Sequence, residues 1–155
     1  MRRFEISLIS VFVALVAAMT PTPTSADDSK AEAKAEGKLV GTWKLVSKKN
    51  QEGKEVEIPQ GTRVLKLLTP THFIAVTHNA DGEVSRASGG SYTLKGDTFE
   101  EVPEFAISST YDLERLKGKM QSFRCKIVGN KWYHSGTLSN GGTIDEKWER
   151  VEKDQ

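Results

Sequence analysis

The amino-acid sequence predicts an all-β protein, folded as a single eight-stranded antiparallel up-and-down barrel. From Leu39 onward, apolar and polar residues alternate with a period of two in about eight short runs, which is typical of half-buried strands. Turns rich in Gly, Asn and Asp separate the runs, and no convincing helix lies between them. This pattern favours a barrel or a sandwich over a βαβ fold, and a barrel also removes the unpaired strand edges that invite aggregation.

The N-terminal residues have the organisation of a signal peptide. Arg2 and Arg3 give a positive start, and residues 6–18 form a mostly apolar run that is too short to span a bilayer comfortably. Residues 24–26 fit a cleavage site, so we expect the mature chain to begin near Asp27 and to be secreted or periplasmic, with a retained anchor as the alternative. The expected division is a signal peptide at 1–26, a charged tether at 27–38 and one barrel domain at 39–152.

Charge and cysteine content exclude several function classes. The 155 residues include 22 Lys and Arg against 21 Asp and Glu. This balance gives no electrostatic reason to bind nucleic acid or, after signal cleavage, an acidic membrane. Cys125 is the only cysteine, so the fold has no internal disulfide and must be stabilised by burial.

Residues 40–48 form the first predicted strand, in which Trp43, Leu45 and Ser47 share one face. Because Ser47 is polar, we expect the far end of this strand to leave the core. A polar connection follows at 51–61, where Pro and Gly interrupt any regular pattern.

Two further strands are predicted at 62–68 and 71–78, separated by the break at Thr69-Pro70. In the strand at 62–68, Leu65 and Leu67 share one face and Lys66 lies on the other. The two faces of 71–78 are too similar in polarity for alternation to choose the inward one. One face carries His72, Ile74, Val76 and His78, and the other carries Phe73, Ala75 and Thr77.

The fourth and fifth strands are predicted at 85–94 and 98–102. A turn at 79–82 precedes the fourth strand, and Gly89-Gly90 within it predicts a bulge or a bend. Residues 103–118 have no clear pattern, and their YDLERLKG stretch fits either a helical turn or an ordered loop. The residues of these two strands that are predicted to face inward are Tyr92, Leu94, Phe99 and Glu101.

The last three strands are predicted at 119–128, 131–138 and 143–151, joined by the Gly129-Asn130 turn and an SNGG turn. Counting outward from Gly129-Asn130, Cys125 pairs with His134. The inward-facing residues are predicted to be Phe123, Cys125, Ile127, Trp132, His134, Leu138, Ile144, Glu146, Trp148 and Arg150.

Four residues predicted to face inward are ionisable: Glu101, His134, Glu146 and Arg150. Charges inside a small barrel are costly unless they are paired, so their presence indicates a polar site. A shift of one residue in register would instead place all four outside.

Gly41-Thr42-Trp43 resembles the G-x-W signature of the lipocalins and their calycin relatives. With GGSYTLKGDTFEE in the middle and DEKWERV near the end, residues 39–152 are similar to a group of secreted bacterial lipocalin-like domains of undefined function. The resemblance implies that Trp43 closes one end of the barrel, with Arg150 packed across its indole as a cation–π contact. Gly41 would let the chain enter the barrel tightly, and any ligand is expected toward the other end.

Catalytic chemistry finds little support in the sequence. Cys125 beside His134 is the one candidate nucleophile and base, but a buried structural Cys near a packed His is the stronger interpretation. The three histidines have no metal-ligand spacing. Glu101 and Glu146 could form a carboxylate pair, although a buried carboxylate paired with Arg150 is favoured.

The sequence therefore predicts a barrel that binds a small, partly apolar molecule, with no metal and no cofactor. A barrel filled by its own side chains that serves as a structural or interaction module is the alternative, and an enzyme is the third possibility. The oligomeric state is left open. The expected ligand-binding residues are Tyr92, Phe99, Glu101, Phe123, Trp132, His134 and Glu146, and the expected structural residues are Gly41, Trp43 and Arg150.

Overall fold

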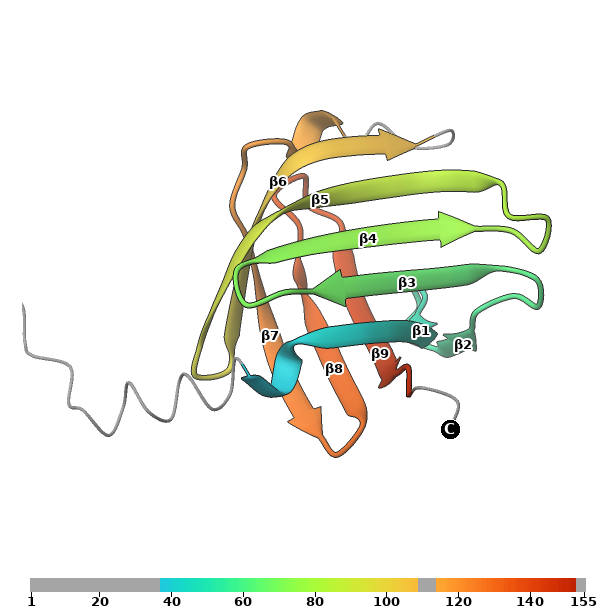
Figure 1. The fold of residues 1–155 in the computed structure, drawn as a ribbon, viewed down its shortest axis with the longest axis horizontal. Coiled ribbons are helices and arrows are strands. Elements are labelled where there is room, and N and C mark those ends of the chain that lie inside the picture. Colours follow the sequence, from blue (N-terminus) through green and yellow to red (C-terminus); the bar gives the residue numbers. More distant parts are fainter. Residues whose placement is uncertain (1–36, 109–113, 153–155) are drawn as a thin grey trace, which may run out of the picture.

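The computed structural model describes residues 37–108 and 114–152 as a closed antiparallel barrel (Figure 1). The strand order is β2-β1-β3-β4-β5-β6-β7-β8-β9, and β1 also pairs with β9, which closes the wall. Eight strands make the barrel and the short β2 is added to it, so the predicted fold class is confirmed. The strands are β1 (Gly41–Lys49), β2 (Glu55–Glu57), β3 (Arg63–Leu68), β4 (His72–His78), β5 (Val84–Lys95), β6 (Thr98–Ser108), β7 (Gln121–Val128), β8 (Lys131–Thr137) and β9 (Thr143–Arg150).

The short strand β2 lies in the connection at 51–61, where no strand was expected. It pairs with the last three residues of β1, whereas the first four residues of β1 pair with β3. β2 therefore covers the part of the β1 edge that β3 does not reach. The far end of β1 leaves the core as expected, because Lys48 and Lys49 are exposed. Ser47 itself is still buried, and its hydroxyl donates a 2.5 Å hydrogen bond to Glu55 of β2.

The predicted bulge at Gly89-Gly90 is present in the β5–β6 pairing. Gly90 lies opposite Pro103, and a Cβ at Gly90 would collide with the backbone carbonyl of Val102. The bulge lets β6 pass through Pro103 and continue to Ser108, six residues beyond the predicted end at Val102. A proline is tolerated in a strand where the ladder is interrupted, which is why the expected break does not occur here.

The strands β6 and β7 pair only over the first four residues of β6. Beyond that point a 3₁₀ turn, η1 (Glu114–Leu116), lies beside β6, and buried Leu116 packs with Ala106 and Leu138. The YDLERLKG stretch thus contains a helical turn at 114–116, while its residues 111–113 lie outside the described part of the chain. The predicted signal peptide and the tether up to residue 36 also lie outside it. Among residues 37–108 and 114–152, no helix has the length and apolarity needed to cross a membrane.

Alternation assigns the inward faces of β1 and of β5 to β9 correctly. The exceptions lie in β3 and β4. Lys66 is buried at 4% exposure and points inward, whereas Leu67 on the opposite face is 44% exposed. In β4 the Phe73 face looks inward. The buried residues of the main core are Leu39, Trp43, Leu45, Leu68, Phe73, Tyr92, Leu94, Phe99, Phe123, Cys125, Trp132 and Trp148.

Candidate functional site

One end of the barrel is closed by the start of the domain. Trp43 is fully buried, its indole N–H donates a 2.8 Å hydrogen bond to the carbonyl of Leu39, and Leu39 is itself fully buried. The Arg150 guanidinium carbon lies 4.3 Å from the centroid of the Trp43 ring. Its two terminal nitrogens donate to the carbonyls of Lys38 and Val40. This arrangement agrees with the closure expected of Trp43 and Arg150.

Gly41 permits this close approach. Its φ is +138°, which L side chains rarely adopt, and a Cβ there would collide with the Arg150 guanidinium. The glycine therefore lets a cation reach the indole face and the backbone carbonyls at once.

Above the closed end lies an aromatic floor, formed by Tyr92, Phe99 and Trp132. Tyr92 stacks on Phe99 with ring centroids 5.0 Å apart, and its hydroxyl donates a 2.6 Å hydrogen bond to the carbonyl of Thr69. Trp132 contacts both Trp43 and Trp148, with ring-centroid distances of 5.7 Å and 5.6 Å. These rings fill the interior next to the closed end.

A cavity of about 430 Å³ occupies the other end of the barrel. The exposed residues 48–51 lie at its mouth, so it is open to solvent there. Its volume lies within the range of small-molecule sites. The side chains that line its inner part are Val64, Lys66, Phe73, Ala75, Thr77, Ser88, Glu101, Phe123, His134, Leu138, Ile144, Glu146 and Trp148.

Lys66 and Glu101 form an ion pair inside the barrel. Their Nζ and Oε2 atoms are 2.5 Å apart, and the side chains are 5% and 12% exposed. The ammonium also lies 4.6 Å from the centroid of Phe73 and 5.0 Å from that of Phe99. The carboxylate and the ring faces together compensate for the burial of this cation. The expected pairing of a buried carboxylate with Arg150 is wrong, because Arg150 is occupied at the closed end.

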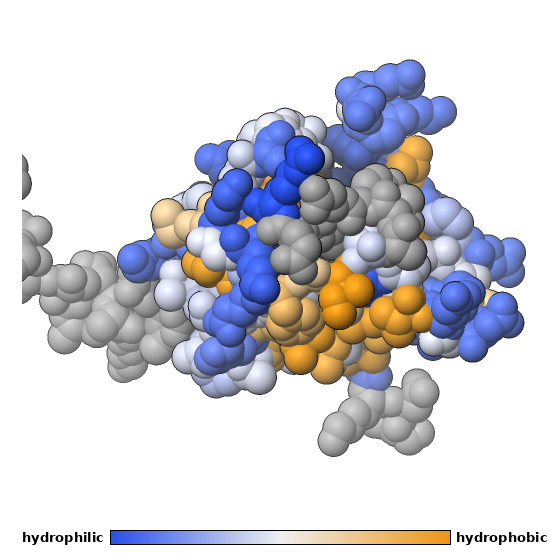
Figure 2. All heavy atoms as spheres, turned by 90° about the horizontal axis from the view of Figure 1, so that it is seen from above, coloured by the Kyte–Doolittle hydropathy of each residue, from blue (hydrophilic) through white to orange (hydrophobic). Residues whose placement is uncertain are grey.

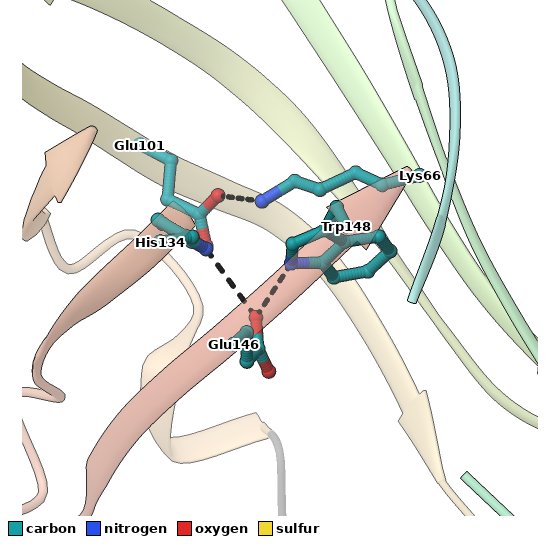
Figure 3. Close-up of polar contacts among 5 residues, drawn as sticks. All are labelled: Lys66, Glu101, His134, Glu146 and Trp148. Carbon is teal, nitrogen blue, oxygen red and sulfur yellow. Dashed lines mark hydrogen bonds and ion pairs between the residues drawn. The ribbon is translucent and has the colours of Figure 1, made fainter. Parts of the chain in front are cut away.

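Glu146 is held between two nitrogen donors (Figure 3). Its Oε2 atom lies 3.3 Å from Nδ1 of His134 and 3.1 Å from Nε1 of Trp148. Burial alone would raise the pKa of Glu146, but the His134 and Trp148 contacts and the positive charge of Lys66 hold it below its ordinary value. Glu146 is therefore ionised at neutral pH.

His134 packs against aromatic rings, with centroid distances of 4.5 Å to Phe123 and 4.8 Å to Trp132. Burial lowers the pKa of His134 in spite of the contact with Glu146. A neutral ring that donates from Nδ1 to the carboxylate leaves Nε2 unprotonated, and this buried atom has no hydrogen-bond partner. In this tautomer the ring has no N–H at Nε2 that would require an acceptor among its aromatic neighbours.

The structure divides the seven residues expected to bind a ligand into two groups. Four line the cavity and three form the packed floor below it. The four are Glu101, Phe123, His134 and Glu146, and the three are Tyr92, Phe99 and Trp132. Sequence reasoning did not place Lys66 or Phe73 in this site. The signal that could have found both is the turn between β3 and β4, because Leu68 pairs with Phe73 and fixes one face for both strands.

Cys125 and His134 are cross-strand partners, as counting from the turn predicts. Burial raises the pKa of the Cys125 thiol to about 11, so the nucleophilic thiolate is scarce at neutral pH. His72 is exposed and contacts Thr71, and His78 contacts the carbonyl of Asn79. The three histidines are therefore engaged with different neighbours.

The outer face of β3 to β6 carries a second notable feature, an apolar patch. Four cross-strand neighbours run across β3 to β6 in the order Leu67, Ile74, Gly89 and Phe105. Ile107 lies two residues further along β6. Phe105 is 41% exposed and Ile107 is 68% exposed. Figure 2 shows apolar side chains gathered on one side of the barrel. Such exposed patches often mark interaction surfaces.

Comparison with known proteins supports the fold. No protein-family model and no curated protein matches the chain. The chain is similar to the crystal structure of an uncharacterized protein from Bacteroides eggerthii DSM 20697, at 16% identity and a TM-score of 0.53, over 72% of this chain and 98% of that one. It is also similar to a redesigned β-barrel (17% identity, TM-score 0.47, 76% and 96% covered) and to a de novo fluorescence-activating β-barrel (18%, 0.42, 76% and 97%).

Proposed function

We propose that this chain is a secreted or periplasmic lipocalin-like protein that binds a small, partly apolar molecule inside its barrel. The observation that carries the proposal is the cavity of about 430 Å³ at the end away from Trp43 and Arg150. Its inner lining combines apolar side chains such as Phe73, Phe123 and Ile144 with a similar number of polar ones, and ligand sites likewise combine apolar walls with fixed polar groups. The resemblance of the Gly41, Trp43 and Arg150 arrangement to the lipocalin signature supports the family assignment.

Native mass spectrometry of the purified mature protein tests this proposal. We expect an adduct of small mass that is released by denaturation and can be identified in an organic extract. A variant with a filled cavity, Ala75→Trp, should lose the adduct, because Ala75 lines the cavity. Ile74→Trp is the matched control, since Ile74 is the preceding residue and faces outward at 47% exposure. An adduct retained equally by both variants would contradict binding inside the barrel.

The apolar patch on the outer face of β3 to β6 favours a second candidate, an interaction module. The partner with the matching chemistry is a second copy of this chain, because an antiparallel sheet face can meet itself across a two-fold axis. Sedimentation at increasing protein concentration tests this candidate. Self-association that Ile107→Lys abolishes would support it, and a monomer at every concentration would exclude it.

A further inference from the structure

The charges in the inner part of the cavity do not balance. Lys66 and Glu101 neutralise each other at 2.5 Å. Glu146 has no cation of its own, because its two contacts are the N–H groups of His134 and Trp148. A carboxylate in partly buried surroundings is stabilised by a matching positive charge. In the inner part of the cavity, among the described residues, Glu146 is therefore a carboxylate without a lysine or arginine in ion-pair contact.

One oxygen of this carboxylate is available to a ligand. Both contacts of Glu146 within the described residues use Oε2, and Oε1 has none (Figure 3). The side chain lines the cavity and is 20% exposed. Oε1 can thus accept a hydrogen bond from a molecule in the cavity without breaking any contact.

The cation in the cavity wall is not available to an anionic ligand. The Lys66 ammonium is committed to Glu101 and is surrounded by the rings of Phe73, Phe99 and Trp132. At the mouth, Lys49 is paired with Asp145 at 2.6 Å. Lys48, the cross-strand partner of Glu146, and Arg86 also line the mouth. Both are exposed and neither is in ion-pair contact with Glu146, so solvent and salt weaken their field.

We propose that the ligand is an amphipathic amine, whose protonated nitrogen binds Oε1 of Glu146 while its apolar body lies against Phe123 and Ile144. This inference rests on the proposed function and specifies its ligand class. The indole of Trp148, which also lines the cavity, adds an aromatic face beside the cation. A fatty acid of the same size would bring its carboxylate toward that of Glu146, so the site selects against it.

Isothermal titration with three probes of one skeleton tests the charge preference. Tryptamine carries an ammonium, tryptophol a hydroxyl and indolepropionic acid a carboxylate on the same indole. We expect tryptamine to bind at least about tenfold more tightly than the other two, since a charge-assisted hydrogen bond contributes about that much. This comparison uses the unaltered mature chain, so it does not depend on a variant folding.

The Glu146→Gln variant assigns the preference to one residue. It should bring the three affinities to within roughly threefold of one another, because the negative charge of Glu146 is gone. Glu149→Gln, the same change on the opposite face of β9, should leave the preference intact. Binding of indolepropionic acid as tight as that of tryptamine would overturn the amine assignment and leave the binding function standing. No binding of any probe, together with no adduct in native mass spectrometry, would overturn both.

Discussion

The two ends of this barrel both combine a cation with an aromatic ring, but one end is closed and the other holds a cavity. At each end a cation lies against an aromatic face, Arg150 at 4.3 Å from Trp43 and Lys66 at 4.6 Å from Phe73. Arg150 donates to neutral carbonyls of the chain that enters the barrel, so every partner at the closed end is part of the fold. Lys66 meets a carboxylate beside an open cavity, and the neighbouring Glu146 keeps an unused oxygen. At the closed end the Trp43 indole and the Arg150 guanidinium are hydrogen-bonded to carbonyls of the chain itself, whereas at the cavity one carboxylate oxygen is left for a ligand.

Removal of the plug should have the largest effect on stability. Trp43→Ala deletes a fully buried indole, so we expect the free energy of unfolding to fall by about 4 kcal/mol. Urea denaturation followed by circular dichroism measures this loss. Where the variant is still folded, binding in the cavity at the other end should persist. A loss below about 1 kcal/mol, as for a surface change, would refute the plug.

The buried ion pair at the open end should come next. Lys66→Met leaves Glu101 without its cation, which should destabilise the fold by about 3 kcal/mol. The double variant Lys66→Met/Glu101→Leu should recover much of this loss, because no uncompensated charge remains. Denaturation of both variants measures the difference. If the double variant were less stable than the single one, the ion pair would contribute to stability by more than neutralising the two buried charges.

The strands that sequence analysis placed correctly have a common property. The alternation in β7 and β8 is strict, and the Gly129-Asn130 turn fixes their register, so Cys125 opposite His134 could be counted from the sequence. That pairing depends on local spacing. The contact of Arg150 with Trp43 joins residues far apart in the sequence, and it could be expected only from the resemblance of Gly41-Thr42-Trp43 to the lipocalin signature.

Lys66 shows where sequence reasoning fails. The run RVLKLL has two apolar residues on each face, Val64 and Leu68 against Leu65 and Leu67, so period two does not decide which is inward. The outer face of β3 is itself apolar because it belongs to the exposed patch, which removes the usual contrast with solvent. The cavity could not be predicted either, because its volume depends on how the side chains of eight strands fill a shared space.

Gly41 offers a smaller change at the closed end. Gly41→Ala should cost about 2 kcal/mol, because the new Cβ meets the Arg150 guanidinium and the φ of +138° is strained for alanine. Gly37→Ala is the control, since a Cβ there has open space. Thermal unfolding of both variants measures the contrast. Equal stability of the two would mean that the guanidinium does not need its close position on Trp43.

The smallest effect expected is a dependence on pH that belongs to the open end. His134 has a pKa below its ordinary value of 6.5 in the folded protein, because it is buried. The unfolded chain therefore takes up a proton near pH 6.5 that the folded chain does not, so stability falls as the pH falls. Between about pH 7 and about pH 5.5 the loss is at most roughly 1 kcal/mol, the limit for a histidine that stays neutral in the folded state. Glu146 has a pKa below its ordinary value of 4.5 in the folded protein. Below about pH 4.5 the unfolded chain therefore takes up a proton that the folded chain does not, and stability falls further.

Two histidine variants separate this contribution from that of the closed end, where no histidine takes part in the Trp43 and Arg150 contacts among the described residues. His134→Gln should flatten the stability profile between about pH 7 and about pH 5.5, because the group that titrates differently in the two states is gone. His72→Gln should preserve the slope, since His72 is exposed. Urea unfolding at several pH values measures both. A slope that survived in His134→Gln would assign the acid sensitivity to the carboxylates, and the neutral imidazole beside Glu146 would then have no part in it.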